Sequence, residues 1–148
     1  ETAYDVLLQP VFVESDMIAD TGWSPESSCL LTIAGDVACW GSAQVAELPD
    51  LSNPQQVETG RQFACAEDDS GVVCWGAYNV PQNPPVLYPP YDLAAGASFV
   101  CALDADGVQC WDAGGESYVP ELINPSNIRS RYPTVCVDDV GEEICWLN

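Results

Sequence analysis

The sequence contains no histidine and no lysine, and its basic side chains are three arginines among 148 residues. Without histidine, Ser-His-Asp triads, Cys-His pairs and histidine metal sites are excluded. Without lysine, Schiff-base chemistry and lysine general bases are excluded. No glycine-rich phosphate loop follows a candidate strand. We therefore expect a protein that is not an enzyme.

The acidic residues number 23, which gives a formal net charge of −20. Such a charge repels nucleic-acid backbones and anionic lipid surfaces, so neither is an expected partner. No apolar run is long enough to span a bilayer. No signal segment opens the chain, so we expect the mature form of a secreted protein. Hydrophobic residues make up 47% of the sequence, enough for a folded core.

The cysteines form a repeat. Their eight positions make four pairs nine or ten residues apart, and a tryptophan follows the second cysteine of each pair. The pairs are Cys29 and Cys39-Trp40, Cys65 and Cys74-Trp75, Cys101 and Cys110-Trp111, and Cys136 and Cys145-Trp146. A period of 35 or 36 residues indicates stacked copies of one supersecondary unit. Trp40, Trp75, Trp111 and Trp146 are therefore expected to pack between repeats.

Each cysteine pair brackets a predicted β-hairpin, because short apolar segments flank a turn that is rich in Asp and Gly. If Cys65 faces Cys74, Asp69-Ser70 is left as a two-residue turn, whereas the first repeat needs a three-residue loop around Ala34. Facing residues of an antiparallel pair lie within disulfide reach. We predict the bridges Cys29–Cys39, Cys65–Cys74, Cys101–Cys110 and Cys136–Cys145. Bridges between neighbouring repeats are the competing connectivity, and zinc would require more closely spaced ligands.

Side-chain alternation predicts sheets that are apolar on both faces. Phe63 and Cys65 lie on one face of the second hairpin, and Ala64 and Trp75 lie on the other. Such a sheet must be covered on both sides. The predicted fold is all-β, with four tandem short antiparallel repeats and disulfide-stapled hairpins. It is propeller-like, either a closed four-bladed ring or an open arc.

The segment Cys-Ala-Leu-x-x-x-Gly-Val-x-Cys-Trp at 101–111, preceded by Gly96-x-x-Phe99, resembles a known repeat. The resemblance is to the bacterial branch of the regulator of chromosome condensation family, and it spans roughly residues 21–148. It implies a β-propeller that serves as a protein-binding platform. The sequence departs from the family pattern at Ser27, where the phenylalanine is missing, and in having four copies where the family often has seven blades.

The two ends of the chain suggest how the last repeat is completed. A linker follows each of the first three hairpins, but the chain stops three residues after Cys145. We therefore divide the chain into an N-terminal strand segment, residues 1–20, and a four-repeat domain, residues 21–148. The segment either closes the domain in cis or adds as a strand to another molecule. The predicted assembly-strand residues are Tyr4, Val6, Leu8, Val11 and Val13.

The leading hypothesis is a secreted, non-enzymatic subunit of an extracellular filament or surface assembly, whose partner is another copy of itself. The alternative is a monomeric propeller module that binds another protein, and a third reading is a carbohydrate-binding protein. Trp23, outside the repeat pattern, is the candidate exposed anchor.

No cofactor is expected beyond weak surface binding of calcium, since Asp104-Ala-Asp106-Gly107 resembles only half of a calcium loop. The acid pairs that a glycosidase would need fall in predicted turns and are expected to be solvated. These pairs are Asp68-Asp69, Asp138-Asp139 and Glu142-Glu143.

Overall fold

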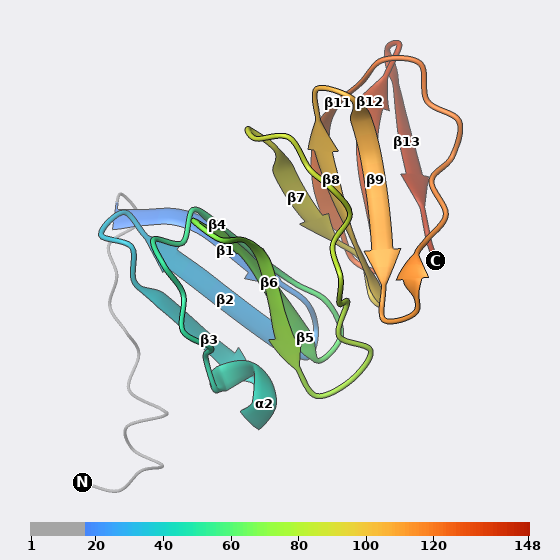
Figure 1. Ribbon diagram of the computed structural model, residues 1–148. Coiled ribbons are helices and arrows are strands. Elements are labelled where there is room, and N and C mark those ends of the chain that lie inside the picture. The colour runs from blue at the N-terminus through green and yellow to red at the C-terminus, as the bar shows by residue number, and fades with distance from the viewer. Residues whose placement is uncertain (1–16) are drawn as a thin grey trace, which may run out of the picture.

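A computed structural model describes residues 17–148, which form four small antiparallel sheets (Figure 1). The predicted all-β fold is confirmed. The first sheet contains β1 (Ile18–Trp23), β2 (Ser27–Thr32) and β3 (Val37–Gly41), and the second contains β4 (Gln56–Thr59), β5 (Phe63–Asp68) and β6 (Gly71–Gly76). The third contains β7 (Asp92–Ala95), β8 (Phe99–Asp104), β9 (Gly107–Asp112) and β10 (Gly115–Glu116). The fourth contains β11 (Pro125–Arg131), β12 (Thr134–Asp139) and β13 (Glu142–Trp146). One short helix, α2 (Ala43–Ala46), follows the first sheet.

The predicted disulfides are confirmed. In every sheet the two cysteines of the repeat face each other across the second and third strands in chain order, with Cα atoms 4.0 to 4.1 Å apart. All eight cysteines are bonded within their own hairpin, so the competing connectivity between repeats is not used. Stable disulfides of this kind are typical of extracellular proteins.

The hairpin turns follow from this register. Asp68 pairs with Gly71 and Asp104 pairs with Gly107, so two residues remain in each turn. In the fourth sheet the turn residues are Val140 and Gly141, with φ of 51° and 81°. Positive φ at both central residues is the requirement of a type I′ turn.

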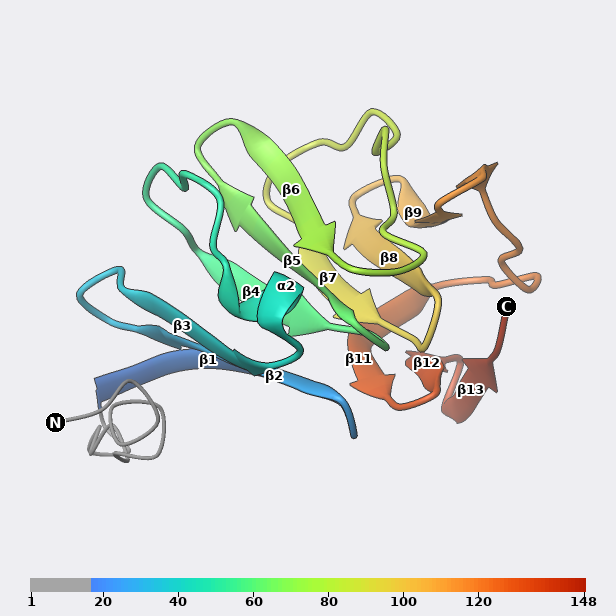
Figure 2. The same ribbon diagram turned by 90° about the horizontal axis from the view of Figure 1, so that it is seen from below.

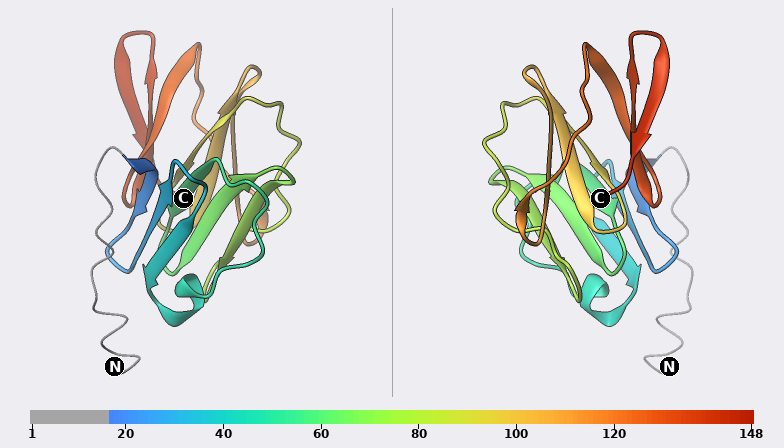
Figure 3. Two further views of the ribbon diagram at one scale, coloured as in Figure 1. Left: turned by 90° about the vertical axis from the view of Figure 1, so that its left-hand side faces the viewer. Right: turned by 90° about the vertical axis from the view of Figure 1, so that its right-hand side faces the viewer.

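The four sheets pack face to face in chain order. A separate apolar core fills each of the three interfaces, and the first strands of successive sheets contact one another (β1 with β4, β4 with β7, β7 with β11). The series curves, so that the first sheet and the fourth turn toward the same side (Figures 2 and 3). The described residues form an open series and not a closed ring.

Side chains on the first strands link each sheet to the next at intervals close to the repeat length. The carboxylate of Asp20 accepts a hydrogen bond from the Val57 amide at 3.0 Å, and the Gln56 side chain accepts one from the Leu93 amide at 2.9 Å. In the fourth sheet the direction reverses, because the Ser130 hydroxyl accepts from the Ala95 amide at 2.8 Å. These bonds satisfy amides that face a neighbouring sheet and so fix how the sheets stack.

Strand number varies among the sheets. The third sheet has four strands and the others have three, so the fourth sheet is not peculiar in lacking an outer strand. β1 begins at Ile18, which places residues 18–20 of the predicted N-terminal segment in the first sheet. The predicted assembly-strand residues Tyr4, Val6, Leu8, Val11 and Val13 lie outside the described residues, and their role stays a prediction.

Replacing a buried repeat tryptophan is expected to cost far more stability than replacing the exposed one. Trp111 is 1% exposed, whereas Trp40 is 51% exposed. Trp111→Ala should lower the free energy of unfolding by about 3 to 5 kcal/mol because it leaves a cavity between two sheets. Trp40→Ala should lower it by less than about 1 kcal/mol. Urea unfolding at low protein concentration measures both, and equal losses would contradict the packing described here.

Candidate functional site

Neighbouring sheets contact each other in the same way at all three interfaces, through a disulfide on one sheet and a tryptophan on the next. The disulfide of one sheet points toward the following sheet, and the tryptophan of the following sheet points back toward it. Thus Trp75 shares a core with Cys29 and Cys39, Trp111 with Cys65 and Cys74, and Trp146 with Cys101 and Cys110. The halves differ because cysteine and tryptophan are adjacent in sequence and must point to opposite faces of their strand.

Trp40 departs from the predicted packing between repeats. Trp75, Trp111 and Trp146 are 9%, 1% and 6% exposed, but Trp40 is 51% exposed. The reason is its position in the series, since no sheet precedes the first one in the described part of the chain. Its indole therefore lies on the outside.

We call the outward side of the first sheet the leading face. Trp23 pairs with Ser28, and Ser28 pairs with Trp40, so one row across the sheet carries two tryptophans separated by a small residue. Trp23 is 64% exposed, in line with its predicted exposure. The next row holds Thr21, Leu30 and Ala38. These two rows of the leading face carry no charged residue.

We call the outward side of the fourth sheet the trailing face. Arg129 pairs with Cys136, which pairs with Cys145, and the following row pairs Arg131 with Thr134. On the other side of the disulfide row, Asp138 pairs with Glu143. The trailing face therefore combines a disulfide with two of the three arginines of the chain.

Ion pairs hold the arginines of the trailing face. The Arg129 guanidinium donates to the carboxylate of Asp138 at 3.0 Å and to that of Glu143, while Arg131 donates to Glu143 at 2.7 Å. Hydrogen bonds from Arg129 lower the pKa of Glu143, and those from Asn127 and Arg129 lower the pKa of Asp138. Both carboxylates are thus kept ionised to lower pH than usual.

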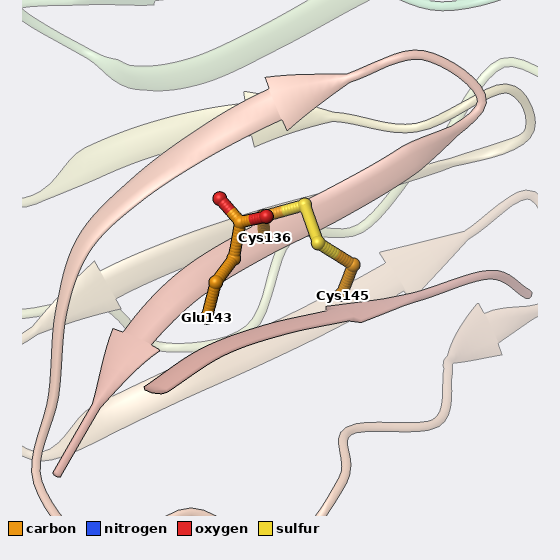
Figure 4. Close-up of side chains that lie close together, drawn as sticks. All are labelled: Cys136, Glu143 and Cys145. Atoms are coloured by element: carbon orange, nitrogen blue, oxygen red, sulfur yellow. A yellow bond between two sulfur atoms is a disulfide. The ribbon is translucent and has the colours of Figure 1, made fainter. Parts of the chain in front are cut away.

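The group Cys136, Glu143 and Cys145 brings two sulfurs and a carboxylate within 4.8 Å of one another (Figure 4). The two sulfurs are bonded to each other, so neither is a thiolate. Because thiolates are the form of cysteine that binds metal, the group does not have the donor set of a metal site.

A cleft of about 810 Å³ is bordered by the first strands of the first, second and fourth sheets. Thr21 and Trp23 line it from the first sheet, Glu58 from the second, and residues 128–134 from the fourth. The Ser130 hydroxyl donates to the Glu58 carboxylate at 3.0 Å, which links the second sheet to the fourth. Burial raises the pKa of Glu58 to about 8, although the bond from Ser130 acts in the opposite direction.

Most acids that sequence reasoning placed in solvated turns have structural contacts. Asp68 accepts hydrogen bonds from the amides of Ser52 and Ser70, and the corresponding Asp139 accepts from Ile123 and Asn124. Asp104 repeats this arrangement with the amides of Tyr88 and Asp106. The segment Asp104–Gly107, which resembles half of a calcium loop, therefore stabilises a hairpin turn. All three are buried. Their spacing of 36 and 35 residues matches the cysteine repeat, so the shared role of these three acids is visible in the sequence.

No family model matches the chain, and no curated protein matches it. Among solved structures it is similar to the entire ectodomain of the receptor kinase CR4 from Physcomitrella patens, with a TM-score of 0.63 and 19% identity. The match covers 89% of this chain and 42% of the ectodomain, so the chain spans less than half the length of that structure. At this identity the likeness concerns the fold. Among residues 17–148, no helix has the length and apolar character needed to cross a membrane.

The protonation of Glu58 is expected to make stability depend on pH. Burial raises its pKa in the folded state from an ordinary value of 4.5 to about 8, so the stabilising contribution is complete below pH 4.5 and is lost as pH rises through 8. Glu58→Gln should remove this loss because glutamine stays neutral. At pH 9 the free energy of unfolding of the variant should exceed that of the unsubstituted protein by about 1 to 3 kcal/mol.

The exposed Glu47 provides the matched control, because Glu47→Gln removes the same charge. Thermal unfolding between pH 4 and 9 measures all three proteins. Parallel pH profiles for the two variants would show that Glu58 has no special role.

Proposed function

We propose that the protein is a non-enzymatic subunit of an extracellular assembly, in which copies join head to tail. The observation that carries this proposal is the exposure of Trp40. The tryptophan at the corresponding position is buried against a disulfide in each of the other three sheets. The trailing face presents the disulfide half of that contact and the leading face presents the tryptophan half.

Two further observations support an extracellular role. The four disulfides require an oxidising environment to persist. The similar solved structure is the ectodomain of a receptor kinase, which supports the same location for this chain. A head-to-tail contact of unlike faces extends into a filament if successive copies do not close, and into a propeller-like ring if they do.

The N-terminal segment, predicted from the sequence to be a strand, would be a second element of the same assembly. Sixteen extended residues can span at most roughly 50 Å, so residues 1–16 of one copy can reach the sheets of a neighbour. The outer edge of β13 has no paired strand among the described residues, and the outer edges of β3 and β6 are open in the same way. Strand addition to such an edge forms a row of main-chain hydrogen bonds.

Exposed apolar side chains on the connecting loops favour a second candidate function, the binding of another protein by a monomer. Val86, Tyr88 and Tyr118 are exposed on the loops that flank the third sheet, and Tyr78 is exposed after the second. Aromatic residues of this kind are enriched at protein interfaces. This candidate is the one to adopt if self-association fails.

Self-association should increase with ionic strength and depend on Trp40. Each copy carries a net charge of −20, so copies repel one another at low salt and approach more closely once salt screens that charge. Sedimentation velocity should show larger species at 0.5 M NaCl than at 0.01 M. Trp40→Ala should weaken association by about tenfold or more.

The exposed Tyr78 lies in the loop after β6, outside the first and fourth sheets, and Tyr78→Ala should associate like the unsubstituted protein. A protein that remains monomeric at every salt concentration would overturn the assembly proposal.

Removing residues 1–16 separates face-to-face stacking from strand addition. If strand addition contributes, the chain 17–148 should fold with all four disulfides but form shorter or fewer assemblies than the full chain. Electron microscopy of both forms gives the comparison. Assemblies of equal length from both would remove the donor-strand element and leave stacking of the two faces.

A further inference from the structure

We infer that the trailing face receives the leading face of a second copy through the flat sides of Arg129 and Arg131 and through the Cys136–Cys145 disulfide. This inference rests on the proposed function and names the chemistry of its contact. The partner is a second copy of this chain, for reasons of position, shape and charge.

Position within the repeat determines which residues would meet. Between the first two sheets, a Cβ on Gly22 would lie 2.8 Å from the Thr59 amide nitrogen, so these two positions touch. Gly22 pairs with the first cysteine of its repeat, and Arg129 pairs with the first cysteine of the fourth repeat. Thr59 occupies the place in its sheet that Trp23 occupies in the first. A second copy stacked in the same way places Trp23 against Arg129.

The same correspondence places Trp40 against the last disulfide. Trp75 packs in one core with Cys29 and Cys39. Trp40 is the equivalent of Trp75, and the Cys136–Cys145 bond is the equivalent of the Cys29–Cys39 bond. Cys145 is exposed in the single chain and Cys136 is buried, so the contact would be made on the Cys145 side of this disulfide.

The shape of the leading face fits a planar cation. Trp23 and Trp40 lie in one row on either side of Ser28, on strands about 10 Å apart. Serine is much smaller than tryptophan, so the middle of this row leaves room between the two tryptophan positions. A guanidinium group stacks on such rings through its flat face, a contact that arginine makes better than lysine.

Hydrogen bonds within the trailing face orient the two arginine side chains. The edges of the Arg129 and Arg131 guanidiniums donate hydrogen bonds to Glu143, and Arg129 also donates to Asp138. These bonds restrict the orientation of both side chains, of which Arg129 is 29% exposed and Arg131 is 59% exposed. In a chain with 23 acidic residues, the two arginines also lower the local charge that a second copy would meet.

Side-chain size implies that the first strands of the two facing sheets lie farther apart between copies than between neighbouring sheets of one chain. The corresponding positions hold Gly22 and Thr59 between the first two sheets, but Arg129 and Trp23 between copies. Larger side chains on the first strands keep those strands farther apart. Successive copies should then curve less sharply than successive sheets, which favours an extended assembly over a tight ring.

Three single variants of equal charge test the arginines. Arg129→Gln and Arg131→Gln should each weaken association about tenfold, whereas Arg61→Gln, in a loop outside the trailing face, should not. Arg131→Lys keeps the charge and should recover only part of the loss. Circular dichroism and thermal unfolding verify that each variant folds, and sedimentation velocity at 0.5 M NaCl measures association. Full association of both Gln variants would overturn the inference.

A mixing experiment tests the pairing of unlike faces directly. A chain with Trp40→Ala has a defective leading face, and a chain with Arg129→Gln and Arg131→Gln has a defective trailing face. Neither should associate alone, but an equimolar mixture should form a species of two chains and no larger one, because one intact contact remains. Blue-shifted tryptophan fluorescence and reduced acrylamide quenching should accompany it.

The outcomes distinguish this inference from the proposed function. If the unsubstituted protein assembles and Trp40→Ala does not, but the arginine variants assemble fully, the assembly stands and the receiving surface is a different one. If the mixture yields no two-chain species, the pairing of these two faces is wrong. If the unsubstituted protein is monomeric at every salt concentration, both the inference and the assembly are wrong.

Discussion

The adjacency of cysteine and tryptophan at the end of each hairpin is the constraint on which the structure depends. Because neighbouring residues of a strand point to opposite faces, each sheet carries its disulfide on one face and its tryptophan on the other. Sheets of this kind can be stacked indefinitely in one direction. The three interfaces of the chain repeat this single contact, as Trp75 on Cys29–Cys39 illustrates.

The negative charge of the chain limits how closely its sheets can pack. With a net charge of −20, close packing of sheets is compatible with folding only where carboxylates are satisfied locally. Asp68, Asp104 and Asp139 meet this condition by accepting backbone amides of their own turns and linkers. Glu58 meets it differently, because burial favours its neutral form, in which it accepts a hydrogen bond from Ser130.

The sequence predicted the hairpins well because their register is a matter of counting. Once Cys65 faces Cys74, the turn at Asp69-Ser70 and the two apolar faces follow without further information. The exposure of Trp40 could not be predicted in this way, because it depends on which sheet lies next to it and not on its own repeat. The clustering of Arg129 and Arg131 with Glu143 was available from strand alternation but required knowing which face of the last sheet is uncovered.

The open series also explains why the two outward faces differ in chemistry when the repeats are so alike. A face that is always buried within the chain can carry glycine or alanine on the first strand of its sheet, as Gly22 and Ala94 show. A face that is exposed in the single chain must remain soluble, and Arg129 and Arg131 with their carboxylates serve that need. The opposite face, with Trp23 and Trp40 exposed, does not serve it. A row of two exposed tryptophans is costly in water unless something covers it, and an arginine-bearing face built on the same repeat is the complementary surface that this chain itself provides.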